Sequence, residues 1–432
     1  MIPVTQRLSP CVTLKSVRTD KFKTERISVV LKTSADVRLT PVEKFVFSVL
    51  KCGCVRYPDK RLINIRLDEL YSSAVFPMFS FDGENASIGF GAEMLGNEYA
   101  SDDVDVFDGT VELIFDLLFD PVLDENGKFL SKFVEREREN ICDTIRSVIN
   151  SPRAYAAKRL VEIMYEGDKF SMPTSGTVEL VQSITADELV SAYQGLIEKA
   201  SCEIFYIGAK SAGELEASLK KHLDKCGFGK ANGKAHSIKF GADTSVIKRV
   251  DEEIAISQAI LMVGYKTGIN ITCGKDFYAM KLFNEIFGGS PVSKLFMNVR
   301  ERLGLCYYCG SKYDSGKGML YVSCGIEGDC RQKAEKEILR QFDNIVQGRV
   351  SDAEFDAAKK SLSNTYSEVT DSASAIERFY SLRASYGVSD TVEDAKQIIS
   401  EITLDDVIRV AKGIKLDTVY FLCGRESGDD ND

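Results

Sequence analysis

Two stretches of the sequence, VQSITADELVSAYQG (181–195) and ISEITLDDVIRVAKG (399–413), follow one pattern. At an offset of 218 residues (402 − 184) they share four identical positions: Ile184 and Ile402, Thr185 and Thr403, Asp187 and Asp405, and Gly195 and Gly413. A strand-like apolar run follows each stretch, CEIFYIG from Cys202 and TVYFLCG from Thr418, and a long helical stretch precedes each one. This shared order predicts two copies of one α/β unit.

The two copies also contain the signals that start a helix. Thr185 and Thr403 are predicted N-caps, because a threonine hydroxyl accepts a hydrogen bond from the first helical turn and acidic residues follow in that turn. Another helix start is predicted at Thr40, with Pro41 in the first turn and Glu43 completing a capping box. The run that closes each copy is apolar at nearly every position, which favours a central, buried strand.

Strands and helices do not alternate in strict βαβ order along either half of the chain. We therefore expect an α+β protein of two homologous domains, each a mostly antiparallel sheet packed with helices. The first domain is predicted at 1–225 and the second at 249–432. The segment between them, 226–248, is rich in glycine and lysine and is predicted to be a linker.

The 432 residues carry a formal net charge of −10, with 44% hydrophobic and 28% charged residues. An acidic chain without a sustained block of lysine and arginine is a poor binder of nucleic acid or anionic membranes. Residues 1–18 do not resemble a signal peptide, and no apolar run reaches the membrane-spanning length of about 20 residues. We therefore expect a cytoplasmic protein with no nucleic-acid or membrane partner. His222, on the polar stretch KKHLDK, and the charge run EREREN from Glu135 are expected to be solvated.

Twelve cysteines are scattered along the chain, and two close pairs stand out, Cys52 with Cys54 and Cys306 with Cys309. A zinc site needs two matching pairs, or one pair with histidines nearby, and these two pairs differ in spacing and lie far apart in sequence. The context of Cys306 and Cys309 is not the strand-turn-helix that suits a redox pair. The pattern favours reduced, mostly buried thiols over a metal site or a disulfide framework.

Two further stretches carry a family resemblance: GGSPVSKLFMNVRERLGLCYY (288–308) and EREN-ICDTIRSVINSP (137–152). Together with the duplicated halves, they resemble the pitrilysin/insulinase metallopeptidase family, in its processing-peptidase-like class. The resemblance covers nearly the whole chain and implies two homologous α+β domains. It also implies that active members bind zinc through H-x-x-E-H on the first helix and a glutamate on a later helix, with the central glutamate taking a proton from the zinc-bound water.

This chain departs from that pattern at every zinc position. Aligned on the glycine after the first helix, the H-x-x-E-H positions hold Lys44, Phe47 and Ser48, and the later glutamate falls on Thr144. A protonated lysine repels zinc, phenylalanine has no lone pair, and a hydroxyl is a poor ligand. We therefore expect no metal in this chain and no peptidase activity of the chain alone; a peptidase with unusual ligands is a third hypothesis. The zinc is expected in a homologous partner.

The resemblance assigns substrate binding to the second half. Arg300 is expected to bind a carbonyl or carboxylate of the peptide, Tyr307 to place a hydroxyl near the substrate backbone, and Gly288 and Gly289 to let the backbone approach. The alternative from the residues alone is a solvated arginine, a packed tyrosine and a glycine pair that ends a helix.

The resulting hypothesis is a non-catalytic subunit of a heterodimeric zinc metallopeptidase that acts on peptides or small unfolded segments. The chain also resembles a bacterial branch of the family that lacks the zinc motif and is paired with a zinc-bearing relative. The alternative is a peptide-binding or scaffold protein on an inactivated peptidase fold.

Overall fold

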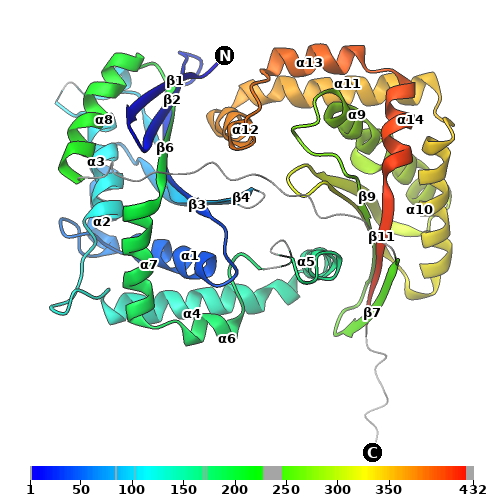
Figure 1. Cartoon of the computed structure of the whole chain (residues 1–432), viewed down its shortest axis with the longest axis horizontal. Helices are drawn as coiled ribbons and strands as arrows, with labels where there is room; N and C mark the ends of the chain where they lie inside the picture. Colours follow the sequence, from blue (N-terminus) through cyan, green and yellow to red (C-terminus); the bar gives the residue numbers. More distant parts are fainter. Residues whose placement is uncertain are drawn as a thin grey trace, which may run out of the picture. The chain divides into compact units, whose positions relative to one another are not determined.

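The computed structural model describes residues 2–82, 85–101, 103–168, 171, 173–226 and 246–424, and the chain divides into two compact units (Figure 1). The first unit comprises Met1–Arg146, Pro173–Ile238 and Thr370–Ser385, and the second comprises Ser147–Met172, Lys239–Val369 and Tyr386–Asp432. Each unit therefore includes one segment whose neighbours along the chain belong to the other unit. The predicted domains, 1–225 and 249–432, are contiguous and do not include this exchange of segments between the units. Most of the predicted linker, 226–248, lies outside the described residues.

The first unit is built on a six-stranded sheet with the order β1-β2-β6-β3-β5-β4. Its strands are β1 (Val4–Ser9), β2 (Val12–Arg18), β3 (Thr24–Ser34), β4 (Ala74–Asp82), β5 (Asn85–Leu95) and β6 (Ser201–Gly208). Its helices are α1 (Leu39–Leu50), α2 (Lys60–Glu69), α3 (Val106–Phe119), α4 (Ser131–Ser147), α6 (Val178–Ser183), α7 (Ala186–Lys199), α8 (Ala212–Cys226) and α12 (Ala373–Ser385), with a 3₁₀ turn η1 (Asn97–Tyr99).

The second unit is built on a five-stranded sheet with the order β7-β11-β8-β10-β9. Its strands are β7 (Lys248–Ile254), β8 (Ala259–Lys266), β9 (Cys306–Asp314), β10 (Met319–Ile326) and β11 (Lys415–Gly424). Its helices are α5 (Pro152–Met164), α9 (Lys275–Asn284), α10 (Arg331–Val346), α11 (Asp352–Glu368), α13 (Val392–Glu401) and α14 (Leu404–Gly413). Two π-helical turns, η4 (Glu285–Gly289) and η5 (Phe296–Arg302), follow α9, and short 3₁₀ turns lie at η2 (Val148–Asn150), η6 (Gly328–Cys330) and η7 (Val369–Asp371). Among the described residues, no helix has the length and apolar character needed to cross a membrane.

The two sheets confirm the predicted duplication. In each, the closing strand (β6 or β11) pairs in parallel with one neighbour (β2 or β7) and antiparallel with the other (β3 or β8). The next two pairings are antiparallel in both sheets, β3-β5-β4 in the first and β8-β10-β9 in the second. The predicted caps are also confirmed, because Thr185 and Thr403 start α7 and α14 with complete capping boxes. The fold is the expected α+β duplication with mostly antiparallel sheets.

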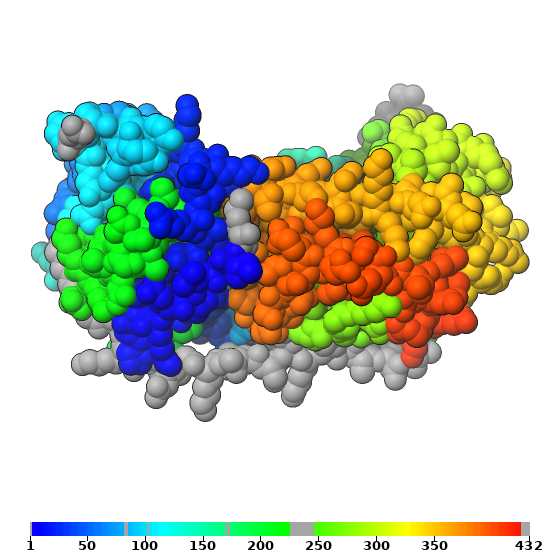
Figure 2. Space-filling view, turned by 90° about the horizontal axis from the view of Figure 1, so that it is seen from above, coloured from blue at the N-terminus to red at the C-terminus, as the bar shows by residue number. Residues whose placement is uncertain are grey.

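The strand β3 divides the first sheet into an apolar and a polar face. Alternate residues Ile27, Val29 and Leu31 join the hydrophobic core with α1, α3 and α7. The even-numbered residues of the strand, including Arg26 and Lys32, point to the opposite face because successive side chains of a strand alternate. Helix α12 covers this second face through contacts with β3 and β6. Figure 2 shows the orange surface of this segment against the blue surface of the first strands.

A buried ion pair holds α12 on this polar face. The Arg26 guanidinium lies 2.5 Å from Glu377 of α12 and 2.5 Å from Glu93 of β5, and it stacks 5.0 Å from the centre of the Phe76 ring. The side chains of Arg26 and Glu377 are 9% and 4% exposed. Charges taken out of water this far are tolerated only when they are paired. The position of α12 is therefore coupled to this pair.

The exchanged helix of the second unit is held differently. Helix α5 packs on β8 and β11, and a Cβ atom at Gly264 would lie 2.4 Å from Sδ of Met164 and 3.2 Å from a methyl group of Leu160. Only a glycine lets the helix approach the strand this closely. Close apolar packing takes the place of the ion pair.

The start of α1 differs from the prediction. The helix begins at Leu39, whose backbone N–H donates to the side chain of Asp36 at 2.9 Å. Thr40 lies inside the helix, and its hydroxyl accepts from the backbone N–H of Asp36 at 2.9 Å, so the predicted capping box of Thr40 and Glu43 is wrong. Glu43 is buried instead, and its carboxylate accepts a 3.2 Å hydrogen bond from Thr33. This burial raises the pKa of Glu43 to about 7.

Two groups that were expected to be solvated are buried. His222 is 2% exposed, lies 3.0 Å from Asp108 and packs 5.5 Å from the Phe115 ring. Within the charge run, the Glu137 side chain is 1% exposed and pairs with Lys51 at 3.0 Å. The prediction for His222 is wrong, and the prediction for the charge run fails at Glu137 but holds for most of its other residues, which are exposed. Both residues are buried because partners from distant segments, absent from the local pattern, compensate the burial.

We expect Arg26→Met or Glu377→Met alone to lower the free energy of unfolding by about 3–5 kcal/mol, because each leaves one buried charge unpaired. The double variant replaces both charges with apolar side chains of similar volume and is expected to recover most of that loss. Urea denaturation of the four proteins measures both values. Additive losses in the double variant would show that the two charges do not depend on each other.

Glu43 is expected to make the protein less stable as the pH rises. Between its unfolded pKa near 4.5 and its folded pKa of about 7, the folded state holds a proton that the unfolded state has released. The free energy of unfolding therefore falls through this window, by roughly 3 kcal/mol in total. Thermal denaturation of the protein and of Glu43→Gln from pH 5 to pH 8 isolates the effect, which the variant should lack. Parallel profiles of the two proteins would contradict it.

Candidate functional site

The zinc positions of the family on α1 are occupied by side chains that take part in packing. The Lys44 ammonium donates to the Ser175 hydroxyl at 2.8 Å and lies 4.8 Å from the centre of the Phe79 ring. Burial lowers the pKa of Lys44. Phe47 is 3% exposed and packs 5.6 Å from Phe90. At two of the positions where an active relative would carry zinc ligands, helix α1 thus makes a cation–π contact and a ring contact.

The remaining two positions offer hydroxyl groups. Ser48 is half-buried, and its carbonyl accepts from the thiol of Cys52 at 3.4 Å. Thr144 is exposed on α4, and its hydroxyl donates to the carbonyl of Asn140 at 2.7 Å. The four predicted positions therefore present an ammonium, a phenyl ring and two hydroxyls. This donor set does not fit a zinc ion, which takes thiolate, imidazole or carboxylate ligands.

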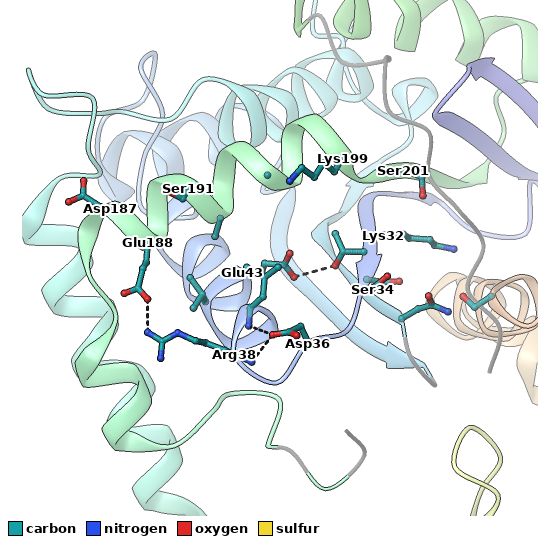
Figure 3. Close-up of a pocket in the computed structure, with 18 of the residues that line it drawn as sticks. Lys32, Ser34, Asp36, Arg38, Glu43, Asp187, Glu188, Ser191, Lys199 and Ser201 are labelled. Carbon is teal, nitrogen blue, oxygen red and sulfur yellow. Dashed lines mark hydrogen bonds and ion pairs between the residues drawn. The ribbon is translucent and has the colours of Figure 1, made fainter. Parts of the chain in front are cut away.

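A cavity of 1090 Å³ opens in the first unit beside α1 (Figure 3). Its wall combines the end of β3, the first turns of α1 and one side of α7, with Lys32, Glu43, Glu188 and Lys199 among its charged lining residues. Arg38 pairs with Glu188 at 2.5 Å at its rim, and this hydrogen bond holds the pKa of Glu188 at about 2. The volume is slightly above the usual range of pockets that hold drug-sized ligands, about 300–1,000 Å³. The sequence did not indicate this cavity, because its lining comes from segments far apart along the chain.

The glycine pair of the second half allows close packing on a strand. A Cβ atom at Gly288 would lie 2.5 Å from the backbone nitrogen of Ser311 on β9, and one at Gly289 would lie 2.6 Å from the side-chain amide of Asn284. The π-helical turn η4 can approach β9 this closely because Gly288 has no side chain, whereas Gly289 makes room for Asn284 at the end of α9. Packing alone therefore explains why glycines occupy these two positions. Their role in substrate binding stays a prediction.

Arg300 and Tyr307 are both exposed at the side of the second sheet. The Arg300 side chain is 43% exposed on η5, and its guanidinium lies 4.7 Å from the Phe296 ring centre and 3.6 Å from Glu301. Tyr307 is 64% exposed at the start of β9, and its hydroxyl donates to Glu327 at 2.7 Å, which raises the pKa of Tyr307. The structure thus presents both predicted side chains to solvent rather than in the core.

The structure also brings a third cysteine to the close pair Cys306 and Cys309. Cys306 and Cys309 meet Cys324 of β10, and their three sulfur atoms lie within 4.8 Å of one another. The Cys306–Cys309 spacing was visible in the sequence, but its third member lies on the next strand. Cross-strand pairing, which the sequence pattern did not specify, places Cys324 opposite Cys309.

Comparison with known proteins identifies relatives of the whole chain. Residues 183–362 match the model of the Peptidase M16 inactive domain. A protein of Bacillus subtilis (strain 168) described as probable inactive metalloprotease YmfF is 30% identical over 424 residues, which covers 96% of each chain.

Two solved structures share the fold. A conserved protein from Enterococcus faecalis V583 superposes with a TM-score of 0.91 at 26% identity, covering 99% of this chain and 100% of that one. A peptidase M16 inactive domain from Pseudomonas fluorescens gives a TM-score of 0.78 at 17% identity, with 99% of each chain covered. The likeness to the second structure concerns the fold alone. The full-length match to the Bacillus protein carries the conclusion that this chain belongs to the M16 metallopeptidase family.

Proposed function

We propose that this chain is a non-catalytic subunit of a heterodimeric zinc metallopeptidase, in which a homologous partner holds the zinc. The donor set on α1 and α4 supports the first part, because Lys44, Phe47, Ser48 and Thr144 cannot ligate the ion. The similarity to a relative described as a probable inactive metalloprotease agrees with it. Chain and partner together would act on peptides or small unfolded segments.

The observation that carries the proposal is the state of Arg300. Its guanidinium lies over the Phe296 ring, 4.7 Å from the ring centre, while its contact with Glu301 is 3.6 Å long and joins neighbouring, half-exposed side chains. Among the described residues, the guanidinium donates no hydrogen bond, and the carboxylate of Glu301 is 3.6 Å away. Its planar fork of donors is therefore oriented by the ring and open to a carboxylate or carbonyl group, for which the geometry of arginine is well suited.

Tyr307 and the strand that carries it suit an extended peptide. Strand β9 lies at the outer edge of its sheet, where a peptide can add as a further strand through main-chain hydrogen bonds. Tyr307 stands at the beginning of this edge, with its hydroxyl oriented by Glu327. Since the hydroxyl donates its proton to Glu327, the lone pairs of its oxygen can accept a hydrogen bond from the substrate backbone.

The test is reconstitution with a homologous subunit that carries an intact H-x-x-E-H motif. We expect peptide hydrolysis only from the mixture, and we expect a chelator to abolish it. In the mixture, Arg300→Ala should lower kcat/KM about 10- to 100-fold, as expected for a charge-assisted hydrogen bond of about 1.5–3 kcal/mol. Tyr307→Phe should have a smaller effect, about 3- to 10-fold, for a neutral hydrogen bond of about 1 kcal/mol.

Arg302→Ala is the matched control, because Arg302 is an exposed arginine on the same π-helical turn. It should change kcat/KM by no more than about 2-fold, as for surface substitutions in general. Equal effects of Arg300→Ala and Arg302→Ala would refute the assigned role of Arg300. Chelator-sensitive hydrolysis by the chain alone would refute the non-catalytic assignment, and peptide binding without hydrolysis in any mixture would favour the scaffold alternative.

A further inference from the structure

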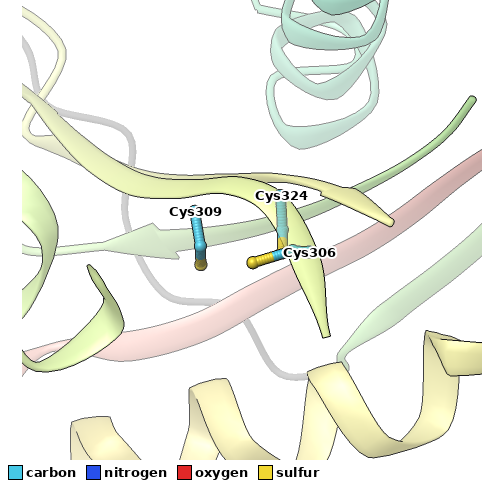
Figure 4. A group of neighbouring side chains, drawn as sticks. All are labelled: Cys306, Cys309 and Cys324. Atoms are coloured by element: carbon cyan, nitrogen blue, oxygen red, sulfur yellow. The ribbon is translucent and has the colours of Figure 1, made fainter. Parts of the chain in front are cut away.

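Three cysteines of the second unit form a cluster on one face of the β9–β10 pair (Figure 4). Cys309 and Cys324 are directly opposite each other in the antiparallel register, so their side chains share a face. Cys306 is three positions before Cys309, and a regular strand would place it on the other face.

A β-bulge brings Cys306 to the same face. Tyr308 pairs with Gly325, but Cys306 rather than Tyr307 pairs with Ile326, so β9 holds one extra residue at this point. The extra residue reverses the alternation of side chains. Tyr307 is consequently exposed, and Cys306 lies beside the other two thiols.

The spacing of the sulfur atoms suits a metal ion. The three atoms lie within 4.8 Å of one another, and three thiolates around zinc at about 2.3 Å stand roughly 3.8 Å apart in a tetrahedral arrangement. Cys324 and Cys309 are 0% and 6% exposed, so β9 and β10 hold two of the three ligands in place. Cys306 is half-buried and leaves a way in from solvent.

The charges around the cluster agree with a bound cation. A metal ion takes cysteine as thiolate. The positive charge of Arg300 acts on Cys306. Three thiolates around a divalent ion carry a net charge of −1, which this guanidinium offsets.

We propose that Cys306, Cys309 and Cys324 form a three-thiolate site for Zn²⁺ or a chemically similar thiophilic divalent ion. Thiolate ligands select such soft or borderline ions over Mg²⁺ and Ca²⁺. The fourth position of the tetrahedron is open to water or an external ligand on the half-exposed side of Cys306. The site lies in the second unit, apart from the zinc positions on α1, and its cysteines have no part in the proposed function.

The test uses the full-length chain, freed of metal and kept reduced with a phosphine. Co²⁺, which replaces zinc in thiolate sites, is added first, and sulfur-to-metal charge-transfer absorption reports binding. Zn²⁺ is then added to displace it, which gives the zinc affinity. We expect saturation at one equivalent. Cys306→Ser should weaken binding more than about 10-fold, because one ligand is lost while the two buried thiols remain.

Cys330→Ser is the matched control, since Cys330 is a half-buried thiol of the same unit outside the cluster. It should leave the charge-transfer absorption and the affinity unchanged. Circular dichroism of Cys306→Ser verifies that the fold is retained. Absence of saturable absorption in the unsubstituted chain, or equal affinities in the chain and in Cys306→Ser, would overturn the proposal. Because no peptidase activity is measured, these outcomes do not bear on the proposed function.

Discussion

The ion pair between Arg26 and Glu377 joins two residues that are 351 positions apart in sequence. Both charges are buried, so α12 cannot leave the polar face of the first sheet without exposing that face and separating the pair. The cost of one unpaired buried charge is several kcal/mol, a large part of the stability of a typical domain. The first unit is therefore complete only after the chain has passed through most of the second. The reciprocal placement of α5 on the second sheet, through Gly264, means that neither half of the sequence covers its sheet alone.

The parts of the fold that the sequence predicted are those specified by local signals. The capping boxes of Thr185 and Thr403 and the apolar strands after them are readable because the residues that interact are three to four positions apart. The exchange of helices is not readable in this way, since its contacts link distant segments. Glu137 and His222 show the same limit at single residues: each lies in a polar stretch, and each is buried by partners from elsewhere.

The residues of the candidate site also differ in how far the sequence predicts them. The unsuitability of Lys44 and Phe47 for zinc follows from their chemistry alone and needs no coordinates. The exposure of Arg300 and Tyr307 depends on the π-helical turn η5 and on the bulge in β9, neither of which has a clear sequence signal. The bulge also decides which face Cys306 occupies. A shift of one residue in this strand would bury Tyr307 and expose the thiol.

The two halves use equivalent sheets in opposite ways. In the first, Lys44 and Phe47 are absorbed into packing against Phe79 and Phe90, which stabilises α1 without any metal ligand. In the second, Arg300 and Tyr307 stand in solvent, where side chains contribute little to folding. An exposed arginine and an exposed tyrosine near the edge strand of a sheet fit a binding surface better than a core. The former zinc positions of the first half thus serve packing, and the proposed recognition by Arg300 and Tyr307 rests on the half that presents its polar groups to solvent.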